Sequence, residues 1–306
     1  MNIKVMKNSK FFIAASLLVI LVGVVFFIVG GFNLGIDFTG GTVITVDMSG
    51  EFDLEVVKDA TQKYATTDYS VAISDKTKAE IKIQDKDVDP EEQNQVREDI
   101  MNDIKAVYPD AAIESIDRVG ATAGAELLQK TIMSVILACG GVLVYIWIRF
   151  ELLSGFSALV ALVHDALIMT ALVLIFRTRI NSSFIAAVLT IVGYSINDTI
   201  VVFDRIRENS KRFSHSLNRE AIVDKSVSET IVRSLNTSIT TLFTITALYI
   251  FGVQSIKEFA LPLIVGIVSG TYSSIFIASP LWVALHKLAK NIKHKKAKKS
   301  EKARKA

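Results

Sequence analysis

The sequence predicts an α-helical polytopic membrane protein with six transmembrane helices and a small α+β domain inserted between the first two. Three observations support this prediction. Six apolar runs are long enough to cross the hydrocarbon core of a bilayer, which takes roughly 20 helical residues. One long acidic segment, residues 32–129, separates the first run from the second. Basic residues gather in three other parts of the chain.

Composition excludes several other classes of protein. The 306 residues are 51% hydrophobic and 21% charged, which is too apolar for a disordered chain. The single cysteine, Cys139, excludes an intrachain disulfide and a cysteine-cluster metal site. Scattered histidines make a histidine metal site unexpected as well; they are His164, His215, His286 and His294. We therefore expect no metal and no cofactor.

The predicted spans are residues 11–31, 132–148, 152–176, 184–203, 235–253 and 259–285. The first run follows a lysine-rich N-terminus, as the apolar part of a signal peptide would. It is long, however, and no small-x-small cleavage site follows it before Asn33. We therefore expect this run to remain in the protein as a membrane span.

Orientation is predicted from basic residues near the span ends, because these favour the cytoplasmic side. Three regions carry such residues. The N-terminus has Lys4, Lys7 and Lys10, and the segment 287–305 has ten basic residues. The segment before span five has Arg205, Arg207, Lys211, Arg212, Arg219, Lys225 and Arg233. An even number of spans places both termini on the same side, and the three basic regions indicate that this side is the cytoplasm. Arg177 and Arg179, in the short loop after span three, indicate the opposite orientation but are outnumbered. The outer segment 32–129 then holds 21 acidic and 9 basic residues, a net charge of −12.

Four parts of the chain follow from this reasoning. We expect residues 1–31 to hold the N-terminus and first span, and residues 32–129 to form the extracytoplasmic domain. Residues 130–285 then form the membrane core with a cytoplasmic loop at 204–234. Residues 286–306 form a basic cytoplasmic tail, which we expect to contact anionic lipids rather than nucleic acid.

The outer segment alternates between strand and helix signals. Residues 42–48 alternate as a half-buried strand does, and residues 53–64 show helical spacing. Two further strands are predicted around 71–73 and 81–83, and Asp89-Pro90 opens a second helix. A final strand is predicted at 113–119. This β-α-β-β-α-β order is that of a small ferredoxin-like domain, a fold that carries no function by itself.

A glycine-rich motif joins the first span to this domain. Gly35, Asp37, Gly40 and Gly41 superficially resemble a phosphate-binding loop. Gly41 stands where such a loop needs lysine, and the motif follows a membrane span instead of a strand. We therefore expect a turn or hinge, in which Asp37 could cap a helix or bind a cation.

Asp198 in span four is the strongest functional candidate. A carboxylate inside a bilayer costs a few kcal/mol at least, so such residues usually face the bundle interior and serve ion movement. The alternative is a structural hydrogen bond near the cytoplasmic end. His164 and Asp165 in span three either belong to the same relay or simply satisfy each other. The two aspartates lack the sequence surroundings of an intramembrane aspartyl protease, and we do not expect an enzyme.

Arg233 precedes span five, and a polar stripe follows it on one helical face. The stripe consists of Thr237, Thr240, Thr241 and Thr244. It could line a hydrated path, with Arg233 pairing with Asp198. The alternative is a basic anchor followed by helix-packing residues. In span six, the four-residue spacing of Gly266, Gly270 and Ser274 predicts close helix packing.

Several of these segments resemble the SecF family, the smaller half of the SecDF protein-export complex. They are residues 35–42, 119–120, 126–127, 163–165, 192–209 and 233–238. The stretch 194–209 is the longest and most specific of them. Ala121 stands where the family usually has proline, which predicts a looser hinge before span two.

The resemblance implies a member of the resistance-nodulation-division superfamily in the bacterial cytoplasmic membrane. It implies pairing with SecD, action beside the SecYEG translocon, and use of a proton or sodium gradient to draw out unfolded preproteins. It also implies that Asp198 and Arg233 serve ion passage, with Asn197 and Thr199 in the same motif. Two alternatives stay open: a subunit of an efflux transporter of that superfamily, and a non-transporting scaffold for SecD.

Overall fold

The computed structural model describes residues 4–65, 69–84, 88–213, 215–252 and 254–305. The chain divides into two compact units. The helical unit comprises Met1–Phe32, Val135–Thr178 and Phe184–Ala306, and the sheet unit comprises Asn33–Ser134 and Arg179–Ser183. The short segment Arg179–Ser183 therefore belongs to the sheet unit, although it lies in sequence between two membrane helices and includes the first residues of the second.

In the described part of the chain, six helical stretches are long and apolar enough to cross a membrane, which confirms the predicted class. They are α1 (Val5–Gly30), α5 (Ala121–Arg149), α6 (Leu152–Ile175), α7 (Ser182–Phe213), α8 (Arg219–Phe251), and a sixth built from α9 (Gln254–Ser273), the π-helix η1 (Ser274–Ala278) and α10 (Ser279–Lys305). Side chains beyond Ile292 lie outside the described residues, and so does the predicted lipid anchor in the tail.

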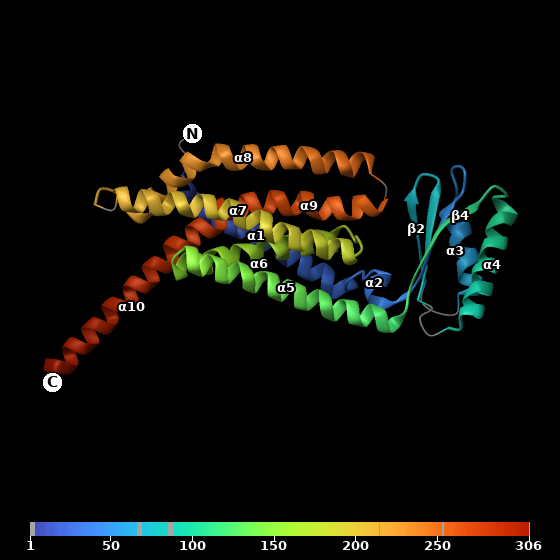
Figure 1. Cartoon of the computed structure of the whole chain (residues 1–306), viewed down its shortest axis with the longest axis horizontal. Coiled ribbons are helices and arrows are strands. Elements are labelled where there is room, and N and C mark those ends of the chain that lie inside the picture. The colour runs from blue at the N-terminus through green and yellow to red at the C-terminus, as the bar shows by residue number, and fades with distance from the viewer. Residues whose placement is uncertain (1–3, 66–68, 85–87, 214, 253, 306) are drawn as a thin grey trace. The chain divides into compact units, whose positions relative to one another are not determined.

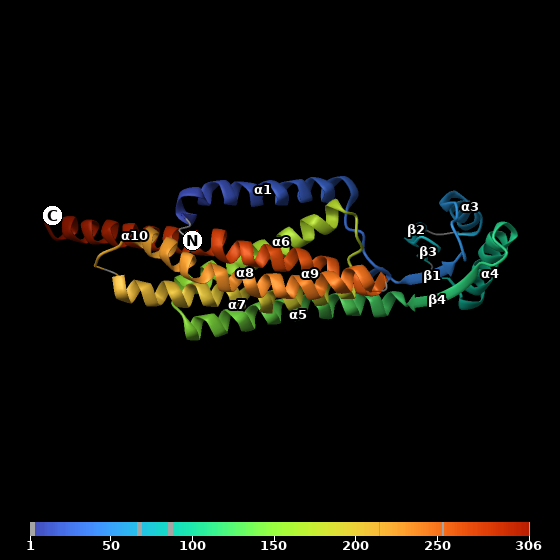
Figure 2. The same cartoon turned by 90° about the horizontal axis from the view of Figure 1, so that it is seen from above.

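Within the helical unit, α9 lies between α6 and α8, and α1 packs on α6 (Figures 1 and 2). Apolar residues from α6, α7, α8, η1 and α10 form one buried cluster, which includes Ala161, Phe203, Val227, Ile275 and Trp282. Large apolar side chains on the outer faces of α1, α5 and α8 remain exposed, as lipid-facing residues do.

The segment 204–234, expected as a loop between spans, is largely helical. α7 continues to Phe213, and α8 begins at Arg219 after the cap residue Asn218, whose side chain accepts from the Ala221 amide at 2.8 Å. Polar contacts hold the end of α7 against the start of α8. For example, Asn209 donates a hydrogen bond to Ser226 at 3.0 Å. A polar sequence thus marks the end of the membrane span without ending the helix.

The sheet unit is built around four antiparallel strands. Its elements are α2 (Ile36–Thr39), β1 (Gly41–Asp47), α3 (Leu54–Tyr64), β2 (Tyr69–Asp75), β3 (Lys78–Ile83), α4 (Pro90–Val107) and β4 (Ala112–Val119). The strand order is β2-β3-β1-β4. Side chains of β1 and β3 pack against α3 and α4 in a single core, which includes Ile44, Val46, Ile81, Ile100 and Ile104. Asp53 and Asp89 cap the two helices.

Candidate ion-coupling site in the membrane helices

Asp198 lies in α7 with its side chain toward α8. Ser234 of α8 donates a short hydrogen bond to Oδ1 of Asp198. The other carboxylate oxygen, Oδ2, is buried and accepts no hydrogen bond from the residues that the structure describes. Burying an oxygen in this way is costly unless a proton or water satisfies it.

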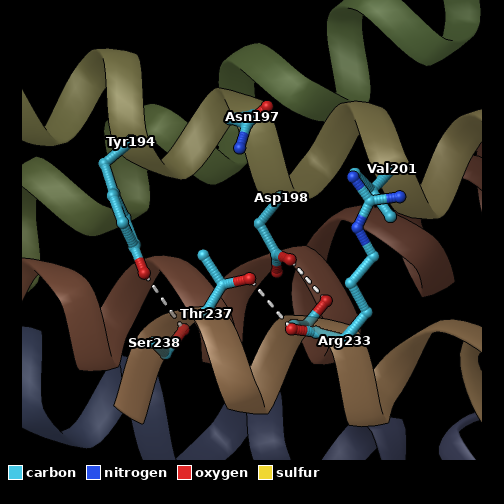
Figure 3. Close-up of a pocket in the computed structure, with 8 residues that line it drawn as sticks. Tyr194, Asn197, Asp198, Val201, Arg233, Thr237 and Ser238 are labelled. Atoms are coloured by element: carbon cyan, nitrogen blue, oxygen red, sulfur yellow. Dashed lines mark hydrogen bonds between the residues drawn. The ribbon is translucent and has the colours of Figure 1, made fainter. Parts of the chain in front are cut away.

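A cavity of about 40 Å³ opens beside Asp198 and has room for a few water molecules. Figure 3 shows the side chains that line it: Tyr194, Asn197, Asp198, Val201, Arg233, Ser234, Thr237 and Ser238. They come from α7 and α8 alone. The hydroxyl of Tyr194 donates to Ser238 at 3.3 Å, which connects the two helices at one end of the cavity.

Arg233 lines the same cavity without pairing with Asp198. Among the residues in the described ranges, no ion pair within 4.0 Å joins the two side chains, so the expected direct pair is not formed. Figure 3 shows the guanidinium extending away from the carboxylate. The arginine therefore contributes a nearby positive charge to the cavity rather than a hydrogen-bonded partner.

The threonine stripe on α8 is largely satisfied within its own helix. Each hydroxyl donates to the carbonyl four residues earlier, at 3.0 Å for Thr237 and Thr240, 2.9 Å for Thr241 and 3.3 Å for Thr244. Such bonds are the default for threonine in a helix. Thr237 also lines the cavity, so the stripe contributes one residue to the site rather than a continuous path.

Asp165 of α6 occupies a second, more deeply buried polar cluster. Its side chain is 1% exposed and accepts hydrogen bonds from three serine hydroxyls. Ser269 donates to Oδ1 at 2.6 Å, while Ser195 and Ser273 donate to Oδ2 at 2.6 and 2.8 Å. We call this arrangement the serine cradle. It joins α6, α7 and α9 around one carboxylate.

His164 stands beside the serine cradle. Its Nδ1 atom lies 3.1 Å from Oδ1 of Asp165. Its Nε2 atom is buried and has no hydrogen-bond partner among the residues described. His164 and Asp165 therefore contact each other, which is what the expectation of a mutually satisfied pair requires. The serines, however, supply most of the hydrogen bonds to Asp165.

Neighbouring residues on two helices connect the serine cradle to the surroundings of Asp198. Thr199, the residue after Asp198, shares a hydrogen bond of 2.8 Å with Ser274. Ser274 follows Ser273 of the cradle and is the first residue of the π-helix η1. Single-turn π-helical segments frequently occur at functional sites. A shift of η1 would therefore change contacts of Ser273, which bonds to Asp165, and of Thr199, which is next to Asp198 in sequence.

The spacing of small residues in α9 lets this helix approach α7. A Cβ atom added to Gly266 would lie 2.4 Å from Cγ1 of Ile191, and one added to Gly270 would lie 3.0 Å from Cβ of Ser195. Ser274, expected as a third packing residue, uses its hydroxyl to bind α7. Close approach is what brings the serines of α9 within reach of Asp165.

The glycine motif has its own structural role in the sheet unit. Gly40 and Gly41 have φ angles of 72° and 124°, which glycine adopts without strain. Asp37 accepts a hydrogen bond at 2.8 Å from the amide of Ser182, the first residue of α7, so it acts as a helix cap. The amide of Gly35 donates to the Ile180 carbonyl at 2.8 Å.

A second contact fixes the same loop to the sheet. Arg179 and Glu80 of β3 form a two-pronged ion pair, in which Nη2 lies 2.6 Å from Oε2. Lys82, on the same face of β3, donates to the Leu34 carbonyl at 2.6 Å. Burial and the neighbouring Arg179 charge lower the pKa of Lys82 below 10.5. The loop between α6 and α7 is thus bound to the sheet at several points.

Sequence reasoning missed four serines of the site: Ser195, Ser234, Ser269 and Ser273. A usable signal existed, because hydroxyl residues recur at helical spacing within otherwise apolar spans. Serine inside a membrane helix commonly bonds its own backbone, however, so the sequence does not distinguish a structural serine from a ligand of the carboxylate.

Six candidate membrane spans in the described residues, with two buried carboxylates among their helices and an antiparallel sheet unit joined to them, define a polytopic membrane protein. Residues 99–288 match the family described as protein export membrane protein SecD/SecF, C-terminal, and residues 25–50 match the SecD/SecF GG motif. The chain belongs to the SecD/SecF family, as a SecF-type, multi-pass protein of the bacterial cytoplasmic membrane.

Individual relatives agree with this assignment. The chain is 36% identical over 300 residues to protein translocase subunit SecF of Sebaldella termitidis, covering 97% of this chain and 96% of that protein. It is 38% identical over 272 residues to the SecF subunit of Helicobacter pylori strain J99, covering 89% of this chain and 83% of that protein.

Solved structures of SecDF are similar as well. A crystal structure of SecDF from Thermus thermophilus, a translocon-associated membrane protein, superposes with a TM-score of 0.84 at 31% identity. The alignment covers 94% of this chain and 39% of that one. SecDF in a super-membrane-facing form gives a TM-score of 0.70 at 32% identity, covering 97% of this chain and 40% of that one. This chain thus spans about two fifths of a SecDF chain.

Proposed function

We propose that this chain is the SecF half of a SecDF complex and uses the proton motive force to assist Sec-dependent protein translocation. SecD is the proposed partner, because the chain accounts for 39% of a fused SecDF chain whose description is translocon-associated. The SecYEG translocon and unfolded preproteins are the proposed further partners. No covalent bond of the substrate changes in this function.

The observation that carries the proposal is the burial and incomplete hydrogen bonding of the Asp198 carboxyl group. One oxygen of this carboxyl group is buried without a hydrogen-bond partner in the described part of the chain, beside a cavity of about 40 Å³. A carboxylate can take up a proton by itself, whereas a metal cation bound here would share a small cavity with the positive charge of Arg233. Among the residues that line the cavity, Asp198 supplies the carboxylate. This supports a proton as the coupling ion, with the positive charge of Arg233 favouring proton release.

A transport cycle follows from these contacts. Protonation of Asp198 neutralises the carboxyl group and weakens its bond with Ser234 and its attraction to Arg233. Helices α7 and α8 then shift, and η1 moves with them through the contact between Thr199 and Ser274. The segment Arg179–Ser183 leads into α7 and contains its first two residues, and its bonds to Asp37 and Glu80 would pass this movement to the sheet.

The proposal includes an orientation and a role for the sheet unit. Positively charged residues near the span ends support cytoplasmic termini, which would place the sheet unit on the outer side. The element order and the strand order β2-β3-β1-β4 support a ferredoxin-like domain. In this arrangement the sheet unit would hold or release unfolded chain as the membrane helices shift.

The test is precursor processing of a secreted reporter in cells that lack their own SecF and co-express this chain with its cognate SecD. We expect Asp198→Asn to abolish rescue at matched membrane levels. Asp204→Asn is the matched control, since this aspartate lies on the same helix and is exposed. Its Oδ1 atom lies 3.6 Å from Nη2 of Arg149, a long ion pair whose loss should matter little. Equal rescue by both variants would refute ion coupling through Asp198 and favour a scaffold.

A further inference from the structure

A second and larger cavity lies in the helical unit, at the end that holds the basic residues between α7 and α8. It measures about 580 Å³ and is enclosed by residues of α5, α6, α7, α8 and α10. Nothing in the proposed ion path uses it. One part of its wall is apolar or aromatic, formed by Ile148, Phe150, Phe203, Ile206 and Trp282.

The remaining wall of this cavity is strongly basic. Arg149, Arg207, Lys211 and Arg219 line it together with a single acid, Glu151. Arg149 lies 3.6 Å from Asp204, and Glu151 lies 3.5 Å from His286. Within the described ranges, Arg207, Lys211 and Arg219 take part in no ion pair. Three positive charges without an ion-pair partner among the described residues therefore face one cavity, and Glu151 is the single acid in its wall.

Hydrogen bonding in the cavity adds an independent observation. The hydroxyl oxygen of Ser210, which lines the cavity, is buried and has no hydrogen-bond partner among the described residues. The indole nitrogen of Trp282 donates to Ser154 at 3.0 Å, which fixes the ring in the wall. A buried donor beside unpaired cations is suited to an anionic oxygen-rich group, such as a phosphate.

We propose that this cavity binds the headgroup phosphate of an anionic phospholipid from the cytoplasmic leaflet. Tryptophan and arginine beside apolar residues are typical of the membrane interface, where one end of a ligand is charged and the other is apolar. Basic pockets between transmembrane helices on the cytoplasmic side bind anionic headgroups in this way. The location at the basic end rests on the orientation proposed above, and the lipid bound here would hold α5, α7 and α10 together.

The experiment uses the purified full-length chain in a nonionic detergent, where no charged membrane surface contributes to binding. Native mass spectrometry measures the binding of dioleoyl phosphatidylglycerol, with phosphatidylethanolamine and free glycerol 3-phosphate as comparison ligands. The test variant is Arg207→Gln with Lys211→Gln. The matched control is Arg212→Gln, which removes one charge from the same helix turn but does not line the cavity.

We expect the wild-type chain to prefer phosphatidylglycerol over phosphatidylethanolamine. Each cavity charge removed should weaken phosphatidylglycerol binding roughly fivefold, while Arg212→Gln should change it by less than about twofold. The thermal midpoint of the lipid-free variants should stay unchanged, because Arg207 and Lys211 form no ion pair with any residue that the structure describes. Equal binding by the double variant and the control would overturn the proposal. Binding of glycerol 3-phosphate as tight as that of the lipid would overturn the lipid assignment in favour of a soluble phosphate ester.

Discussion

Replacing Asp165 by alanine removes the common acceptor of the serine cradle. Three serine hydroxyls bond to this carboxylate at 2.6 to 2.8 Å, and all four residues are buried, with exposed fractions between 0% and 6%. A side-chain hydrogen bond between membrane helices is worth about 0.6 kcal/mol on average and up to about 1.7 kcal/mol. A charged acceptor belongs at the upper end, so three bonds amount to roughly 3–5 kcal/mol.

Removing one of the three serine donors should lower the stability of the folded chain by less than removing Asp165. Ser273→Ala loses the 2.8 Å bond to Asp165, together with a weaker 3.2 Å contact to the Gly270 carbonyl of its own helix, and should lower stability by about 1–1.7 kcal/mol. With roughly 2–4 °C of melting temperature per kcal/mol for a chain of this size class, we expect a decrease of about 2–7 °C. Asp165→Ala should lower the melting temperature by roughly 6–20 °C on the same scale.

Thermal unfolding of the purified chain in detergent measures these changes directly. Thr244→Ala serves as the control, because its exposed hydroxyl donates to its own helix at 3.3 Å and its loss should change stability by no more than about 0.5 kcal/mol. An Asp165→Ala variant no less stable than Ser273→Ala would refute the reasoning, since the carboxylate would then not be the centre of the cluster. Indistinguishable Ser273→Ala and Thr244→Ala variants would refute it equally.

The close packing of α9 and the loop contact with the sheet give two further predictions. Gly266→Ala should destabilise the chain by about 1–3 kcal/mol because the new Cβ would lie 2.4 Å from Ile191, whereas Gly193→Ala, with nothing within 4 Å, should stabilise it by up to about 1 kcal/mol in the same thermal assay. Arg179→Gln should cost about 1.5–3 kcal/mol and reduce reporter export, and the exchange Arg179→Glu with Glu80→Arg should restore part of both. A destabilised Arg179→Gln variant with full export would show that this ion pair supports the fold without serving transport.

Local sequence was sufficient to predict the membrane spans and the class of protein. A span depends on the number of consecutive apolar residues, and this number is read directly from the chain. The same local logic placed Asp198 and Asp165 inside spans. It did not predict how residues 204–234 are arranged, because contacts such as that between Arg205 and Glu229, at 2.7 Å, join parts of α7 and α8 that are distant in sequence.

The partners of the two carboxylates were decided by tertiary structure alone. Asp165 receives its hydrogen bonds from residues 30 to 108 positions away, which helix packing brings together. Asp198 bonds to Ser234 rather than to the adjacent Arg233, because neighbouring residues on a helix point about 100° apart. Sequence thus determined that two aspartates lie in apolar runs long enough to span a membrane, since that depends on composition along the chain. Which groups face them depends on how the helices cross, and only the folded chain fixes that geometry.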